Sequence, residues 1–437
     1  MNRPTLPLRK RTAFTLVLLL LALLLVEGFV FLAYWAIEKR PFPRSEFRTA
    51  MALAGRGGDP AADRETEGGE ITVGDRWVEV IHPYQGFVQH PEKNPDRSVY
   101  GFPGGEADLF VGRGAGRLVI GVFGGSFAAE THRYGMETIA RELEPLGKEV
   151  VLLNLAMGGY KQPQQLLTLS YFLSLGAEFD GVVNIDGFNE VALPLAENVP
   201  GGVNPFFPRK WSWRVMGTLP PESITDLAEM GAIDRRRRSF ARTFSESPLR
   251  RSVTASLIWR FGDGRIERRR AEIERSLATR GRSSTDYSLT GPPAEFKSDW
   301  ELCAALAANW ERSSRLMNDL CLANGAVYLH FLQPNQYVEG SKPMGEEERR
   351  VAIYLGHPYR PGVLLGYPLL CERGRALASE GIPFHDLTMI YSGIPDAIYR
   401  DSCCHPNERG YRLVARAVGE ALFAALSGGR ELPPRSE

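Results

Sequence analysis

The chain has 437 residues, of which 43% are hydrophobic and 24% are charged, a composition typical of a globular protein with one large domain or two smaller ones. Lysine plus arginine and aspartate plus glutamate each number 52, so the formal net charge is zero. This balance argues against nucleic acid or an acidic polymer as the main partner.

The N-terminal segment 12–37 is apolar and long enough to cross a bilayer with some tilt. Glu27 is the one charged residue within it, and the surrounding leucines can offset the roughly 2–4 kcal/mol that a lone carboxylate costs on membrane-insertion scales. We interpret Glu27 as a tolerated or protonated side chain, with pairing to another helix as the alternative. The segment therefore predicts a transmembrane helix.

The residues on either side of this segment predict its orientation. Residues 1–11 are basic, and the basic residues after the segment are diluted by Glu38 and Glu46, so we expect a cytoplasmic N-terminus. No A-x-A-like cleavage site follows the apolar core, which favours an uncleaved signal anchor over a removed signal peptide. We therefore expect a single-pass membrane protein whose remaining residues lie in the periplasm or outside the cell.

After the anchor, segment 38–76 is rich in Gly, Asp, Glu and Arg, which predicts a flexible tether. From 77 to 427, strand and helix patterns alternate and predict one α/β domain with a mostly parallel sheet covered on both faces. The alternation breaks at about 192–298, which we interpret as an insertion, and 428–437 reads as a polar tail. The predicted strands are 118–123, 149–155, 181–185, 326–332 and 383–386. The predicted helices are 127–146, 164–175, 252–277, 299–323, 362–380 and 407–426.

Four short segments at the ends of these elements carry candidate catalytic groups. Ser126 follows two glycines at the turn between a strand and a helix, which exposes its hydroxyl at the carboxyl edge of the sheet, with a phosphate loop or a plain turn as the alternative. Gly159 follows the next strand and can offer a backbone N–H to an oxyanion, with a plain βα turn as the alternative. Asn189 follows the third strand and can donate its amide, or form an Asx-turn or helix cap.

The fourth segment lies in the loop before the last helix. His405 in this loop, with Asp401 nearby, suits a general base whose tautomer is held by a carboxylate. Each of the four signals is weak alone. All four fall at one edge of one predicted sheet, so together they predict a single catalytic site.

In order and context, the four segments resemble the sequence blocks of the SGNH/GDSL hydrolases, named after Ser, Gly, Asn and His. The resemblance spans roughly 80–426 without the insertion, and it implies a flavodoxin-like three-layer α/β/α sandwich. It also implies a serine ester hydrolase that needs no cofactor. By this resemblance Ser126 is the nucleophile, His405 is the general base and then the acid, and Asp401 orients His405. The N–H groups of Ser126 and Gly159 and the amide of Asn189 form the oxyanion hole.

The sequence departs from the family pattern at two places. Gly125 stands where the family usually has aspartate, a position outside the catalytic set. The acid usually stands three residues before the histidine, but that position is Ser402, and Asp401 is one residue further away. Either the loop accommodates the extra residue, or Asp396 or a backbone carbonyl takes the role of the acid.

The cysteines and one polar segment give weaker signals. The five cysteines form no CxxC pair and have no histidine at zinc-ligand spacing, so we expect no metal site. An odd number also excludes a fully paired disulfide framework; if the domain lies outside the cytosol, one or two bridges are compatible with the sequence and at least one thiol stays free. Segment 333–336 ends a predicted strand at the active edge, and we interpret it either as a substrate-binding loop or as an ordinary polar turn.

The expected location suggests the substrate. A tethered domain outside the membrane would meet O-acylated envelope or exported glycans, so we expect an ester-bearing substrate of that kind. One alternative is an O-acyltransferase that passes an acetyl group to a sugar hydroxyl at the same site. The other is a non-catalytic, membrane-tethered glycan-binding or scaffold protein with a decayed triad, which the irregular spacing of Asp401 favours.

Overall fold

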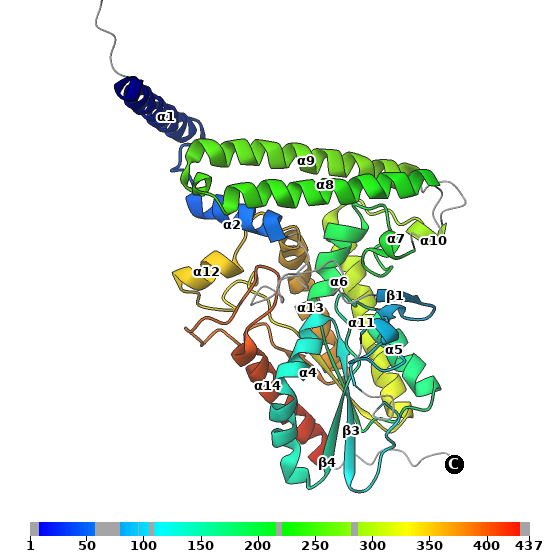
Figure 1. Ribbon diagram of the computed structural model, residues 1–437. Coiled ribbons are helices and arrows are strands. Elements are labelled where there is room, and N and C mark those ends of the chain that lie inside the picture. Colours follow the sequence, from blue (N-terminus) through cyan, green and yellow to red (C-terminus); the bar gives the residue numbers. More distant parts are fainter. Residues whose placement is uncertain are drawn as a thin grey trace, which may run out of the picture. The chain divides into compact units, whose positions relative to one another are not determined.

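The computed structural model describes residues 8–56, 79–94, 96–104, 109–215, 221–280 and 287–428. The chain divides into two compact units, which we name the helical unit (Met1–Arg64 with Thr225–Ile273) and the sheet unit (Glu65–Ile224 with Glu274–Glu437). Figure 1 labels their elements. Most of the predicted basic N-terminus, the 57–76 part of the predicted tether and the predicted tail after residue 428 lie outside the described residues.

The sheet unit contains a five-stranded sheet of order β4-β3-β5-β6-β7, in which every neighbouring pair is parallel. The α/β class and the parallel sheet predicted from the sequence are therefore confirmed, and each predicted strand agrees with its observed bounds to within one residue. The strands are β3 (Arg117–Gly124), β4 (Glu149–Asn154), β5 (Gly181–Asp186), β6 (Val327–Leu332) and β7 (Phe384–Asp386).

Helices connect these strands, and each predicted helix agrees with its observed bounds to within three residues. A separate antiparallel hairpin, β1 (Glu79–His82) and β2 (Gly86–Gln89), was not predicted. The longer helices of the sheet unit are α4 (Ser126–Leu143), α5 (Gln164–Ser174), α11 (Asp299–Ala323), α13 (Arg360–Ser379) and α14 (Glu408–Ser427). The short ones are α6 (Phe188–Leu193), α7 (Trp211–Arg214), α10 (Tyr287–Thr290) and α12 (Glu346–Ala352).

Alternate side chains of the strands enter two different hydrophobic cores, as the pleat of a strand requires. Ile120 and Val122 of β3 pack in one core with α4 and α14, which lie side by side in Figure 1. Val119 and Phe123 of the same strand pack in the other core, with side chains of α5, α11 and α13. Because both faces are covered, ligands can reach the sheet at the carboxyl ends of its strands.

The helical unit holds α1 (Leu8–Glu38), α2 (Arg44–Arg56) and most of α8 (Pro221–Ser245) and α9 (Val253–Arg280). Within α1, Leu20–Glu38 is long and apolar enough to cross a membrane. Helix α2 lies in the segment predicted as a flexible tether. That prediction relied on the polar average composition of residues 38–76 and so missed the buried side of this helix, which carries Met51.

The carboxylate of Glu27 in α1 has partners at the start of α9. It accepts hydrogen bonds from the Ser252 hydroxyl (2.8 Å) and from the backbone N–H groups of Val253 and Thr254. The unsatisfied N–H groups and positive dipole end of a helix N-terminus stabilise a carboxylate. The structure thus favours the helix-pairing alternative for Glu27 over an unpartnered, merely tolerated side chain.

Candidate active site

Ser126 stands at the turn from β3 to α4. β3 ends at Gly124, whose φ of +141° and lack of space suit only glycine, since a Cβ there would lie 2.1 Å from the carbonyl oxygen of Ile185. Ser126 is then the first residue of α4, and it is half-buried. The N–H groups of a first helical turn have no acceptor within the helix, so they can donate to an anion beside the hydroxyl.

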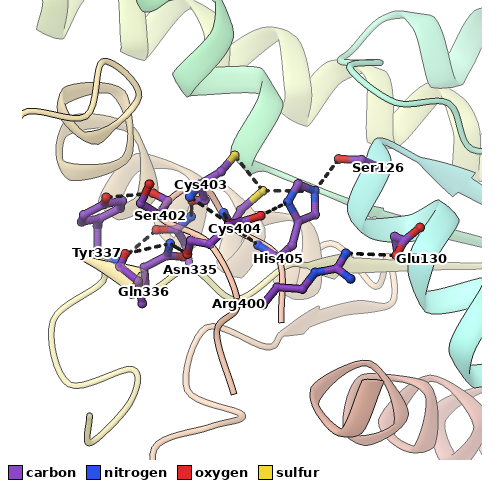
Figure 2. Close-up of polar contacts among 12 residues, drawn as sticks. Ser126, Glu130, Asn335, Gln336, Tyr337, Arg400, Ser402, Cys403, Cys404 and His405 are labelled. Atoms are coloured by element: carbon purple, nitrogen blue, oxygen red, sulfur yellow. Dashed lines mark hydrogen bonds and ion pairs between the residues drawn. The ribbon is translucent and has the colours of Figure 1, made fainter. Parts of the chain in front are cut away.

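His405 reaches Ser126 from the loop before α14, 279 residues later in the chain. Its Nε2 lies 2.9 Å from the Ser126 Oγ, and its Nδ1 lies 2.6 Å from the Asp401 Oδ2 (Figure 2 labels Ser126 and His405). A carboxylate at Nδ1 requires an N–H there, which leaves Nε2 free to accept the serine proton. The three side chains thus form a Ser–His–Asp chain in the geometry of a nucleophile and its base.

Asp401 makes this contact despite its irregular spacing because the loop folds around its carboxylate. Its Oδ1 accepts hydrogen bonds from the N–H groups of Cys403 (2.9 Å), Cys404 (3.0 Å) and His405 (3.1 Å). Asp396, the other candidate acid, instead pairs with Arg409 at 2.5 Å on the surface. Of the acids considered, the structure therefore brings Asp401 to His405.

Electrostatics keep Asp401 ionised beside the histidine. Burial alone would raise the pKa of Asp401, but the adjacent His405 and the backbone N–H groups lower that pKa to about 2. Burial alone would lower the pKa of His405, whereas Cys404 and Asp401 together raise it above its usual range. A permanently charged Asp401 can therefore stabilise the imidazolium that forms when His405 takes up a proton.

The glycine and asparagine segments meet beside Ser126. The Asn189 Nδ2 donates to the carbonyl oxygen of Tyr160 (2.7 Å), the residue after Gly159, and a Cβ on Gly125 would lie only 2.3 Å from the same Nδ2. Gly125 thus leaves room for the asparagine amide, which is why this chain has no side chain there. Gly159 has a φ of +82° and is buried beneath Arg209.

Glu190 joins these two segments and was not singled out from the sequence. Its carboxylate accepts from the N–H of Gly187 (2.7 Å), the N–H of Gln162 (3.0 Å) and the amide of Gln165 (3.0 Å). Burial first, and then the nearby charge of Asp186, raise the pKa of Glu190 to about 8. Glu190 therefore fixes the turn of Asn189 against the loop that follows Gly159.

Segment 333–336 supports the loop of Asp401 and His405 rather than facing outward. The Asn335 amide donates to the Cys403 carbonyl (3.2 Å), and the Gln336 amide donates to the Asp401 carbonyl (3.1 Å). Tyr337 adds a hydrogen bond from its hydroxyl to the carbonyl of Ser402 (2.8 Å), as Figure 2 shows. All these side chains are buried, so the substrate-binding interpretation of the segment gives way to a structural one.

An ion pair that the sequence did not reveal joins helix α4 to the loop that carries Asp401 and His405. Glu130 lies one helical turn after Ser126 in α4, is buried, and pairs with Arg400 at 3.1 Å. Arg400 directly precedes Asp401, so the pair links the helix that begins at Ser126 to the loop of Asp401 and His405 (Figure 2). Only the fold shows this pairing, because 270 residues separate the two side chains.

Arg209 forms a second feature beside Gly159. Its guanidinium makes two hydrogen bonds to Glu197 (2.7 and 3.1 Å), and the hydroxyl of Tyr359 donates to the same carboxylate at 2.6 Å. Arg209 and Glu197 belong to the first residues of the predicted insertion, which in this part lies within the sheet unit. The insertion therefore contributes side chains next to the site and is not only a peripheral addition.

A second Ser–His–Asp chain lies inside the sheet unit. The Ser314 Oγ is 2.8 Å from the His330 Nδ1, and the His330 Nε2 is 2.8 Å from the Asp186 Oδ1. Asp186 also accepts from the indole N–H of Trp310 (2.6 Å) and the amide of Asn184 (2.8 Å). Ser314 and His330 have no exposed surface, so no substrate can reach this chain without unfolding the core.

Comparison with known proteins adds no relative. No protein-family model matches the sequence, and no curated protein matches it. The candidate function therefore rests on the geometry around Ser126.

Proposed function

We propose that this protein is a membrane-anchored serine ester hydrolase of the SGNH/GDSL type. The observation that carries the proposal is the chain of contacts from the Ser126 Oγ through His405 to Asp401, at 2.9 and 2.6 Å. The strand order β4-β3-β5-β6-β7, with helices packed in both cores, agrees with the flavodoxin-like three-layer sandwich that the family resemblance implies.

In the proposed reaction, the Ser126 Oγ attacks the carbonyl carbon of an ester while the Nε2 of His405 takes the hydroxyl proton. The tetrahedral intermediate collapses, and the alcohol leaves with the proton returned by His405. Water then attacks the acyl-enzyme and gives its proton to His405. Collapse of the second intermediate releases the carboxylic acid and returns the proton to Ser126.

The oxyanion of each intermediate needs donors that are already in place. Ser126 offers its backbone N–H at the start of α4, and the Asn189 Nδ2 has a second proton besides the one donated to Tyr160. Gly159, whose backbone φ is positive, offers the third N–H. Each such donor contributes roughly 2.7–4 kcal/mol of transition-state stabilisation in serine hydrolases, so all three account for much of the rate.

The geometry weighs against a decayed site. The irregular spacing of Asp401 favours a scaffold protein. In the structure, however, the Asp401 Oδ1 accepts hydrogen bonds from three backbone N–H groups of its own loop, and these bonds bring its other oxygen to His405. We therefore favour catalysis over passive binding.

The proposed substrate follows from the expected location of the sheet unit. With α1 as a signal anchor and a cytoplasmic N-terminus, the sheet unit lies in the periplasm or outside the cell. There it would meet O-acylated envelope or exported glycans, and the same site could pass the acyl group to a sugar hydroxyl instead of water. Reporter fusions placed after Arg44 test this topology, and a cytosolic signal would overturn it.

A fluorophosphonate probe on the detergent-solubilised full chain tests the chemistry. We expect covalent labelling of the wild type and none of Ser126→Ala. Ser314→Ala is the matched control, because Ser314 also contacts a histidine that is bound to an aspartate but is buried, and it should label like the wild type. Absence of labelling in folded wild-type protein would remove the proposal. Release of acetate from acetylated sugars, with and without an acceptor glycan, then separates hydrolysis from acyl transfer.

A further inference from the structure

Two adjacent cysteines in the catalytic loop place their sulfurs beside the catalytic histidine. The Sγ atoms of Cys403 and Cys404 lie 3.3 Å apart, and the Cys404 Sγ lies 3.8 Å from the Nε2 of His405 (Figure 2). The two sulfurs and a ring nitrogen of His405 all lie within 4.8 Å of one another, and all three residues are buried. None of the proposed catalytic steps uses these sulfurs.

The spacing of these atoms fits a single small cation. In a tetrahedral zinc site, with Zn–S near 2.3 Å and Zn–N near 2.0–2.1 Å, neighbouring sulfurs are about 3.7 Å apart and sulfur and nitrogen about 3.5 Å. The observed 3.3 and 3.8 Å differ from these values by amounts that small rotations of the side chains remove. Two thiolates and an imidazole are also the ligand set that soft and borderline cations prefer.

A disulfide between the two cysteines fits the geometry less well. Consecutive Cα atoms across a trans peptide are about 3.8 Å apart, below the roughly 4.4–6.8 Å that disulfides span. The Cys403–Cys404 bond would therefore need the backbone of the catalytic loop to distort. That backbone is held by the carboxylate of Asp401 and by Asn335, so cation binding, which leaves it in place, is favoured.

We propose that Cys403, Cys404 and His405 bind a thiophilic cation such as zinc, and that the bound ion switches off the catalytic site. Binding releases the two thiol protons to solvent and places the cation on the Nε2 of His405. That nitrogen lies 2.9 Å from the Ser126 Oγ, so the ion displaces the hydrogen bond to the nucleophile, and the Oγ can fill the fourth position. The inhibition rests on the proposed function, whereas the binding does not.

Cadmium titration of the reduced, metal-free full chain in detergent tests the binding without any assay of activity. We expect one ion per chain, reported by the ultraviolet thiolate-to-cadmium absorption band. Cys403→Ser and Cys404→Ser should each weaken binding by more than the 10–100-fold that loss of a supporting second-shell group costs. Cys371→Ser is the matched control, because Cys371 lies in α13 outside this cluster, and it should bind like the wild type.

The results separate this proposal from its competitors. No band, or a band that persists in both loop variants, would overturn the site. So would peptide mapping, before any reductant is added, that finds Cys403 and Cys404 joined by a disulfide. Ser126→Ala must still bind cadmium, and this outcome holds even if the chain proves not to be an esterase. In an active enzyme, zinc should abolish turnover, a chelator should restore it, and Cys404→Ser should resist zinc.

Discussion

The two Ser–His–Asp chains of this protein contain the same residue types at similar distances, yet they differ in their surroundings. In the first, Ser126 begins a helix at the carboxyl edge of the sheet and is half-buried. In the second, Ser314 lies within α11 and is fully buried, with its helical N–H already used. The hydrogen bonds from serine to histidine, 2.9 and 2.8 Å, do not distinguish them.

The difference shows which features make such a chain reactive. A nucleophile needs a path for the substrate and donors for the oxyanion. Of these two serines, Ser126 is the one with exposed surface, and it stands at the start of a helix, where the first N–H groups have no acceptor within the helix. A buried chain instead satisfies polar groups that the core would otherwise leave unpaired, and so it specifies the packing of β5, β6 and α11. Substitutions in the two chains test this difference.

The largest expected effect is on turnover at Ser126. Ser126→Ala should lower ester hydrolysis about 10⁴–10⁶-fold, since the nucleophile acts as a unit with His405. Its thermal unfolding should stay close to that of the wild type. Ser314→Ala should do the reverse, with turnover close to wild type and a melting temperature several degrees lower. Kinetics with a p-nitrophenyl ester and a thermal scan measure both, and a loss of turnover in Ser314→Ala would break the distinction.

Asp401→Asn tests the acid of the first chain. The amide can still accept backbone N–H bonds at its oxygen, but it holds His405 in the wrong tautomer, which should lower turnover about 10⁴-fold. Asp396→Asn is the matched control, because Asp396 pairs with Arg409 at the surface. Equal losses of turnover in the two variants would show that turnover depends on the structure of the loop rather than on the carboxylate beside His405.

His330→Phe tests the second chain through stability. It leaves the buried carboxylate of Asp186 without its imidazole partner, which should reduce the free energy of unfolding by about 3–5 kcal/mol. Urea unfolding followed by tryptophan fluorescence measures this loss. Turnover per folded molecule should be unchanged, and a folded but inactive variant would show that the buried chain also serves the reaction.

The pH dependence of stability beside the buried chain depends on Glu190. Glu190 has its pKa raised from 4.5 to about 8 in the folded protein, so between these values the folded state holds a proton that the unfolded state lacks. Its contribution to stability is complete below about pH 4.5 and is lost as the pH rises through 8. Glu190→Gln, which stays neutral, should flatten this decline in urea unfolding between pH 5 and 8, and an unchanged slope would contradict the assignment.

Much of the framework could be predicted because its signals are local. The strands of the parallel sheet are short apolar runs, and α4, α11 and α14 have amphipathic patterns bounded by turns. The prediction failed for α2, whose few buried side chains lie in a segment of polar average composition, and it did not identify the β1–β2 hairpin. The acid of the triad remained open, because nothing in the spacing of Asp401 indicates that three N–H groups of its own loop turn it toward His405.

Local pattern by itself determined the α/β class, the order of the strands along the chain and the four turns at one edge of the sheet. Only the tertiary structure decided which distant side chains meet: Glu130 with Arg400, Ser314 with Asp186 through His330, and the cysteine sulfurs with His405. Hydrophobic periodicity fixes elements over about 5–20 residues. Contacts between side chains hundreds of residues apart depend on how the elements pack, which no local pattern encodes.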